Sequence, residues 1–173
     1  KNMLKSGDQY PVQDFSREMA VALHIKTEFS EIYAPLNMED AVKYKSENPE
    51  VVIFSGSTDL GVQFNKGNIR PKKILSLHLI PELYKCDIKN NKVFVGARVS
   101  LNDLHKLVST KVPKLDQFLN IFASPQIKHS ATLVGNLANA SPIADTTPVM
   151  MALDAVIHAK GLKGERKLSL HNF

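Results

Sequence analysis

Short apolar runs alternate with amphipathic stretches over the first part of the chain. Residues 51–54 form a continuous apolar run rich in β-branched side chains, which is typical of a strand buried on both faces. Residues 32–35 and 73–77 predict two further short strands. Between the first two strands we expect a helix that begins after Asn37, a suitable cap, and ends near Ser46. The order of elements favours a β-α-β arrangement.

The pattern of the second part predicts a hairpin followed by helices. Two adjacent asparagines, Asn90 and Asn91, separate short alternating runs and predict a β-hairpin over residues 85–96. A helix capped by Ser100 is expected next, because apolar residues recur on one face at helical spacing: Leu101, Leu104, Leu107 and Val108. We then expect a second helix over residues 113–122, a stretch of small and amide side chains over residues 124–145, and a strand or helix over residues 149–159.

These patterns together predict an α+β protein in two lobes. We expect a first lobe over residues 31–80 and a second lobe over residues 81–173, because the pattern changes near Pro81. Residues 1–30 show little strand pattern, and residues 16–23 predict a short helix. We interpret residues 1–30 as a linker. Since the sequence does not begin with Met, we expect it to be a piece of a longer polypeptide.

Composition narrows the class of protein. The 173 residues are 43% hydrophobic and 23% charged, which is ordinary for a globular chain. The net charge of +5 comes from basic residues spread along the chain without aromatic interleaving, so a solvated surface is favoured over a nucleic-acid interface. No apolar run approaches the roughly 20 residues that a membrane-spanning helix needs.

The residue types that carry catalysis or bind metals are sparse. Cys86 is the single cysteine, so neither an intrachain disulfide nor an iron–sulfur cluster with four thiolates can form within the chain, and a cytoplasmic location is expected. The six histidines show no metal-like spacing, and no Ser/His/Asp set can be argued. We therefore expect no catalytic side chain and no metal ligand.

The first segment of interest, residues 54–61, reads F-S-G-S-T-D-L-G directly after the apolar run. Small residues between a strand and a helix allow backbone N–H groups to converge on a diphosphate, and the helix N-terminus adds favourable partial charge. The segment lacks the lysine of a Walker loop and the three glycines of a Rossmann fingerprint. A plain turn between strand and helix is the alternative.

The second segment, residues 130–145, is S-A-T-L-V-G-N-L-A-N-A-S-P-I-A-D. Its side chains are mostly small or carry amides, which suits close backbone approach to a polyphosphate and ribose, and Asp145 could accept a hydrogen bond from a ribose hydroxyl. A polar loop without a ligand is the alternative. Two such segments in one small chain favour a dinucleotide site.

Both segments, in this order, resemble the FAD loops of molybdenum hydroxylase flavin subunits. The first family loop often reads G-G-T-D or G-N-T-E after an apolar strand, and residues 51–61 match it. The second family signature is I-R-N-x-A-T-[IL]-G-G-N, followed by N-A-S-P-x-x-D-x-x-P. Here it reads I-K-H-S-A-T-L-V-G-N at residues 127–136 and N-A-S-P-I-A-D-T-T-P at residues 139–148. The match covers about residues 31–173.

This resemblance implies the two-lobed FAD-binding fold of the vanillyl-alcohol-oxidase/PCMH type, with the C-terminal part absent. It implies that both segments wrap the diphosphate and that one aromatic lies against the flavin. The implied FAD contacts are Ile53, Phe54, Ser55, Gly56, Ser57, Thr58, Asp59, Leu60, Phe122, Thr132, Leu133, Val134, Gly135, Asn136 and Asp145.

The chain departs from the family pattern at three positions. Ser57 stands where many members have Gly and some have Asn, and His129 replaces the usual Asn. Val134 replaces the first Gly of the G-G-N motif, and a β-branched residue would be strained there if the position needs a positive φ.

The resemblance looks closest to the bacterial xanthine dehydrogenase small subunit. It implies an oxidoreductase component that takes electrons from iron–sulfur clusters through FAD to NAD. The clusters and the molybdopterin would lie on other domains or chains. The flavin domain of a carbon monoxide or aromatic-substrate dehydrogenase is an alternative within the family. A non-catalytic scaffold that has lost FAD is an alternative of another class, favoured by Val134 and by the early end of the chain.

Overall fold

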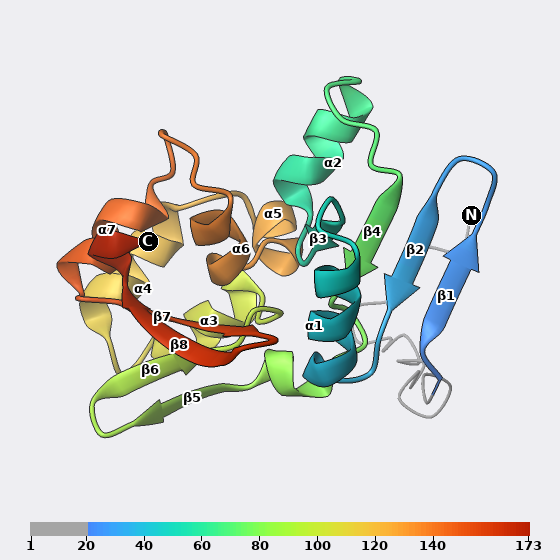
Figure 1. Cartoon of the computed structure of the whole chain (residues 1–173). Coiled ribbons are helices and arrows are strands. Elements are labelled where there is room, and N and C mark those ends of the chain that lie inside the picture. The colour runs from blue at the N-terminus through green and yellow to red at the C-terminus, as the bar shows by residue number, and fades with distance from the viewer. Residues whose placement is uncertain (1–20) are drawn as a thin grey trace, which may run out of the picture.

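The computed structural model describes residues 21–173, and its first half is built on a four-stranded sheet in the order β1-β2-β4-β3 (Figure 1). The central strands run parallel, and β1 pairs antiparallel with β2. The helix α1 joins β2 to β3, and α2 joins β3 to β4. The elements are β1 (Leu23–Lys26), β2 (Glu31–Ala34), α1 (Met38–Glu47), β3 (Val52–Phe54), α2 (Thr58–Asn65) and β4 (Lys73–Ser76).

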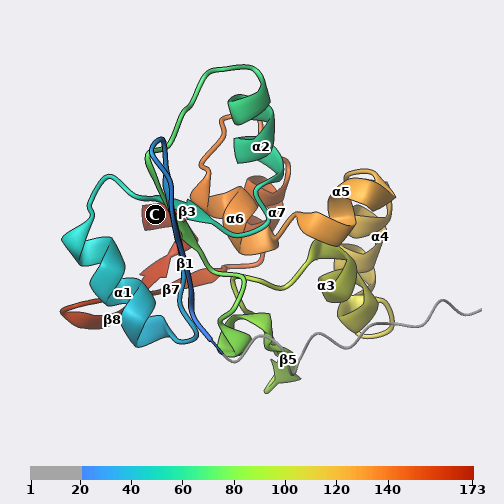
Figure 2. The same ribbon diagram turned by 90° about the vertical axis from the view of Figure 1, so that its right-hand side faces the viewer.

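Local chemistry explains where α1 begins. The side chain of Asn37 accepts a hydrogen bond of 2.8 Å from the backbone N–H of Asp40, so the expected cap is confirmed. In Figure 2 the sheet is seen nearly edge-on, with α1 against one face. Between α1 and the sheet, four residues form a small buried core: Ala41, Val51, Leu75 and Ile80.

Two expectations about these strands are wrong. The strand β3 is not buried on both faces, because Ile53 is 43% exposed. The lead-in contains a strand that was not expected, β1, and its four residues are all exposed. Residues 16–20 of the helix expected at 16–23 lie outside the described residues, and Leu23 belongs to β1.

The second half consists of short helices and two hairpins. Its elements are η2 (Pro81–Tyr84), β5 (Cys86–Lys89), β6 (Lys92–Val95), α3 (Leu101–Val108), α4 (Pro113–Ile121), α5 (Pro125–Ser130), α6 (Leu133–Ala138), α7 (Thr146–Ala152), β7 (Val156–Gly161), β8 (Gly164–Ser169) and η3 (Leu170–Asn172). The hairpin expected around Asn90 and Asn91 is confirmed, and both asparagines have the positive φ that such a turn requires. Ser100 caps α3 as expected, accepting from the N–H of Asp103.

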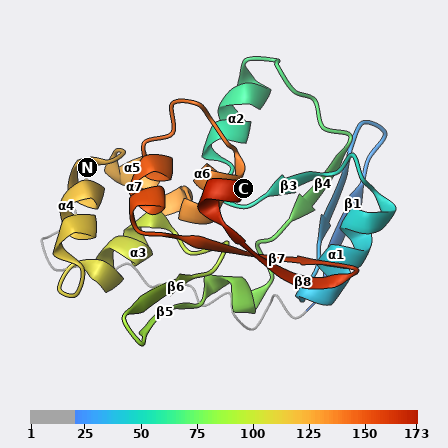
Figure 3. The ribbon, with the colours of Figure 1, turned by 60° about the vertical axis from the view of Figure 1, so that its left-hand side comes forward.

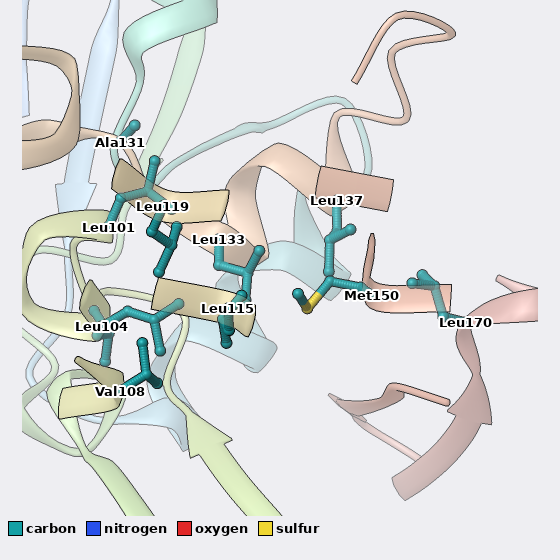
Figure 4. Packing of buried hydrophobic residues seen from close by; sticks show 11 residues of the cluster. Leu101, Leu104, Val108, Leu115, Leu119, Ala131, Leu133, Leu137, Met150 and Leu170 are labelled. Atoms are coloured by element: carbon teal, nitrogen blue, oxygen red, sulfur yellow. The ribbon is translucent and has the colours of Figure 1, made fainter. Parts of the chain in front are cut away.

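The main core lies among the helices of this half (Figure 4). Leu101, Leu104 and Val108 of α3 point toward Leu115 and Leu119 of α4. Leucines of α6, Met150 of α7 and Leu170 extend the cluster. Complete burial of such a side chain contributes about 1.5–3 kcal/mol, so this cluster holds the short helices together.

Residues 124–159 are more regular than expected. The small-residue stretch contains two helices of six residues each, α5 and α6, instead of a continuous loop. Residues 149–159, for which the sequence allows a strand or a helix, contain both: they complete α7 and then begin β7.

The hairpin β7–β8 reaches from the helical half to α1, as Figures 1 and 3 show. Near its tip, Lys160 makes an ion pair with Glu39 of α1 at 2.6 Å. A groove of ≈ 550 Å³ lies between the tip and α1, and the side of β3 carrying Ile53 lines it. Within residues 21–173, none of the helices is long and apolar enough to cross a membrane.

Candidate functional site

The two segments predicted from the sequence contact each other where β3 ends. Ser55 donates a hydrogen bond from Oγ to the carbonyl oxygen of Ala97 at 2.6 Å. The same hydroxyl lies 3.3 Å from Oγ1 of Thr132, which is 77 residues away in the sequence. Ser55 therefore links the first segment to the second segment and to the chain before α3.

Gly56 packs directly against the backbone of the second segment. A Cβ placed on Gly56 would lie 2.3 Å from the carbonyl oxygen of Ser130 and 3.0 Å from the backbone nitrogen of Thr132. Real Cβ atoms do not approach backbone atoms so closely, so only glycine fits here. The glycine allows the main chains of the two segments to pack directly together.

The first segment then turns into α2 through Ser57. Ser57 has φ 56° and ψ 18°, the left-handed conformation that Gly and Asn adopt most readily. Gly and Asn, the residues that the resemblance implies at this position, suit this conformation. The hydroxyl of Ser57 is buried and has no hydrogen-bond partner among the described residues, and no side chain caps the N-terminus of α2.

The second segment is ordered by Thr132. The side chain of Thr132 caps α6 by accepting a hydrogen bond of 3.1 Å from the N–H of Gly135. Its neighbour Ala131 accepts from the N–H of Leu101 at 2.8 Å, which ties the segment to α3. Val134 lies within α6 and has no positive φ, so the strain considered for a β-branched residue does not arise.

Asn136 extends the site toward α7. The hydroxyl of Thr146 donates a hydrogen bond to Oδ1 of Asn136. Asp145, directly before Thr146, is exposed and makes no ion pair or side-chain hydrogen bond within residues 21–173, so its carboxylate is free to accept one. A continuous chain of contacts thus runs from Ser55 through Thr132 to Asn136 and Thr146, the residue after Asp145.

Two implied site residues lie at the margins of this arrangement. Phe122 follows α4, where its ring stacks on Phe118 with centroids 5.1 Å apart, and it packs on the main core. Lys128 holds the C-terminal end of α4, just before Phe122. Its buried side chain donates from Nζ to the carbonyl oxygen of Asn120 at 3.2 Å. Ile53 faces the groove beside α1, whereas Ser55 and Gly56 contact the second segment.

Sequence reasoning missed three groups of the site. They are the carbonyl oxygens of Ala97 and Ser130, and the hydroxyl of Thr146. The backbone carbonyls carry no sequence signal. The position of Thr146 was a usable signal, because this threonine directly follows the predicted site residue Asp145 and begins α7. Within residues 21–173, no group of three or more His, Cys, Asp and Glu residues gathers as metal ligands.

A family model of the FAD binding domain in molybdopterin dehydrogenase matches residues 26–173. The chain belongs to this family. The residues of the FAD-binding domain described above fit the cofactor of the family. A diphosphate only accepts hydrogen bonds, and the uncapped N-terminus of α2 offers donors beside small residues that permit close approach.

Two relatives illustrate the range of the family. Over 131 residues the FAD-binding domain is 30% identical to xanthine dehydrogenase of Calliphora vicina, a match that covers 69% of this chain and 10% of that protein. Over 149 residues it is 27% identical to the nicotinate dehydrogenase FAD-subunit of Eubacterium barkeri, covering 83% of this chain and 50% of that subunit. The chain therefore spans half or less of the length of these relatives.

Solved structures share the fold. Carbon monoxide dehydrogenase from Hydrogenophaga pseudoflava matches with a TM-score of 0.77 and 23% identity, over 85% of this chain and 52% of that chain. Quinoline 2-oxidoreductase from Pseudomonas putida 86 matches with a TM-score of 0.76 and 23% identity, over 84% of this chain and 52% of that chain. These likenesses confirm the expected α+β fold class.

Proposed function

We propose that FAD binds along the contact between the two segments and that this chain is the flavin domain of a xanthine dehydrogenase-like molybdenum hydroxylase. The observation that carries the proposal is the packing of Gly56 against the backbone of residues 130–132. It brings together two segments, each suited to a diphosphate, that are far apart in the sequence.

Each group of residues has a distinct task in this proposal. The amides at the start of α2 (Thr58, Asp59 and Leu60) and Asn136 donate to the diphosphate. Asp145 accepts a hydrogen bond from a ribose hydroxyl, and Phe122 lies against the flavin. The first turn of α6 lies close to the diphosphate through Leu133, Val134 and Gly135. The first segment is supported from β3 by Ile53 and Phe54. When bound, FAD supplies the redox chemistry, and the protein supplies binding and orientation.

The whole enzyme extends beyond this chain. We infer that iron–sulfur clusters and a molybdopterin subunit lie on other domains or chains, that NAD accepts the electrons, and that the location is cytoplasmic. The lobe boundary near Pro81 belongs to the same proposal, whereas the linker expected over residues 1–30 is not kept whole, because β1 within it pairs with β2. The names of the solved neighbours also support the alternative of a carbon monoxide or aromatic-substrate dehydrogenase.

The scaffold alternative loses one of its supports. It relied on a strained Val134, but Val134 lies in α6 with no positive φ. The N-terminus of α2, which no side chain caps, leaves backbone donors for an anionic cofactor.

Flavin titration tests the proposal. We expect saturable binding of FAD, measured by absorption and flavin fluorescence, with FMN binding more weakly because it lacks the second phosphate and the adenosine. Gly56→Ala should abolish FAD binding, since its Cβ would collide with the carbonyl of Ser130. Gly61→Ala is the matched control, because nothing lies within 4 Å of a Cβ at that position of α2. Equal FAD affinity of the two variants would contradict the proposed site.

A further inference from the structure

We propose that Thr146 is a positioning residue for FAD: its hydroxyl holds the amide of Asn136 so that the nitrogen Nδ2 faces the diphosphate. The inference rests on the proposed function and extends it to a residue outside both predicted segments.

The first support is the direction of the hydrogen bond. Oγ1 of Thr146 donates to Oδ1 of Asn136, so the amide oxygen is occupied by the protein. A side-chain amide has one accepting and one donating end, and fixing the oxygen fixes the nitrogen on the opposite side. Nδ2 makes no hydrogen bond to any of residues 21–173 and is not a buried orphan, so it remains open to a ligand.

The second support is burial. Thr146 is 0% exposed, so water does not compete for its hydroxyl, whereas Asn136 is only partly buried. A hydrogen bond shielded in this way holds one orientation of the amide more firmly than an exposed one would. Asn136 itself is fixed by α6, in which its backbone N–H donates to the carbonyl oxygen of Thr132 at 3.0 Å.

The third support is the match with the ligand. The phosphate oxygens of a diphosphate accept hydrogen bonds and cannot donate them. With Nδ2 toward the ligand, Asn136 contributes a donor. With the amide reversed, its oxygen would face the phosphate and repel it. In the structure Thr146 donates to Oδ1, so it holds the amide in the orientation that binds an anion, and it does so from the first residue of α7.

The test is a double-mutant cycle on FAD affinity in the whole chain. Thr146→Val keeps the shape and removes the hydroxyl, and it should weaken FAD binding by about tenfold, as expected for one hydrogen bond to a charged group. Thr146→Ser restores the donor and should bind FAD within about twofold of the wild type. Thr147→Val is the matched control: it makes the same chemical change one residue further along and should leave FAD affinity unchanged.

The cycle separates positioning from a general structural role. In an Asn136→Ala background, Thr146→Val should cause no further loss of affinity, because the group that it positions is gone. An equal loss with and without Asn136 would overturn the proposal, as would wild-type affinity in Thr146→Val. Thermal unfolding of each variant without FAD shows whether it is folded, and Thr146→Ala replaces the valine variant if that one unfolds. If the wild-type chain shows no saturable FAD binding, both the proposed function and this inference fail.

Discussion

Ser57 combines two unfavourable features in a single residue. Its backbone is left-handed, with φ 56°, and its hydroxyl is buried without a partner among the described residues. A left-handed conformation costs a residue with a Cβ about 1–2 kcal/mol, and an unpaired buried hydroxyl costs about 1–3 kcal/mol. The loop before α2 is therefore less stable than it would be with glycine.

Ser57→Gly should accordingly raise the free energy of unfolding by about 1 kcal/mol, after allowance for the greater freedom of glycine in the unfolded chain. Urea unfolding followed by circular dichroism measures the change. The control is Ser55→Gly, which should destabilise because Ser55 has no positive φ and its hydroxyl bonds Ala97. A less stable Ser57→Gly protein would show that the hydroxyl has a partner after all.

The sequence predicted the site residues that are recognised by residue type. Gly56 and Thr132 were expected in the site and do lie where the two segments meet, although their contact with FAD stays a prediction. The carbonyl oxygen of Ala97 could not be predicted, since every residue has one and its partner Ser55 is 42 positions away.

The elements β1, β2 and α1 share one polar cluster around Glu31. The carboxylate of Glu31 accepts hydrogen bonds from His24 at 2.7 Å and from Tyr44 at 2.9 Å, and the bond from His24 is the main reason that the pKa of Glu31 is lowered. Burial, and then the bond to Glu31, raise the pKa of Tyr44 to about 12. The neutral phenol of Tyr44 is thus favoured in the folded state.

Stability should therefore fall at high pH. A folded-state pKa above the ordinary value of 10.0 gives stability that is complete below pH 10.0 and is lost as the pH rises through about 12. Urea unfolding of the wild type and of Tyr44→Phe measures this loss. The range of about pH 9 to 12 is chosen because it spans these two pKa values. The variant should be less stable at neutral pH and should show a weaker decline. An identical decline in both proteins would assign the alkaline loss to other groups.

Elements with strong local signals were predicted, and elements defined by packing were not. The caps Asn37 and Ser100 fixed the starts of α1 and α3 in advance. The helices α5 and α6 have only six residues each, too few for a periodic pattern to stand out. The burial of β3 was predicted wrongly as well, because the apolar composition of residues 51–54 does not reveal that Ile53 is 43% exposed.

At the scale of the whole molecule, the proposed FAD site joins the two buried clusters. The first segment follows β3, beside the small core of α1 and the sheet, and the second segment contributes Ala131, Leu133 and Leu137 to the main core. A ligand bound to both segments should stabilise both clusters together.

FAD at 100 times its Kd should raise the free energy of unfolding by about 2.7 kcal/mol. Hydrogen exchange should show added protection in α1 as well as in α3, since each helix belongs to a different cluster. FMN at the same concentration should protect less. Protection confined to α3 would mean that the flavin contacts only the second segment.

The surroundings of Gly56 also determine how this domain can evolve. A side chain at Gly56 would meet main-chain atoms of residues 130–132, and main-chain atoms are the same whichever amino acid stands there. No second substitution can therefore make room, so Gly56 variants should lack compensating partners in a selection for FAD binding. Gly61 and Gly161 have open space where a Cβ would stand, with nothing within 4 Å, and are free to drift. The first segment thus contains one position that cannot change, Gly56, and five residues later one that can, Gly61.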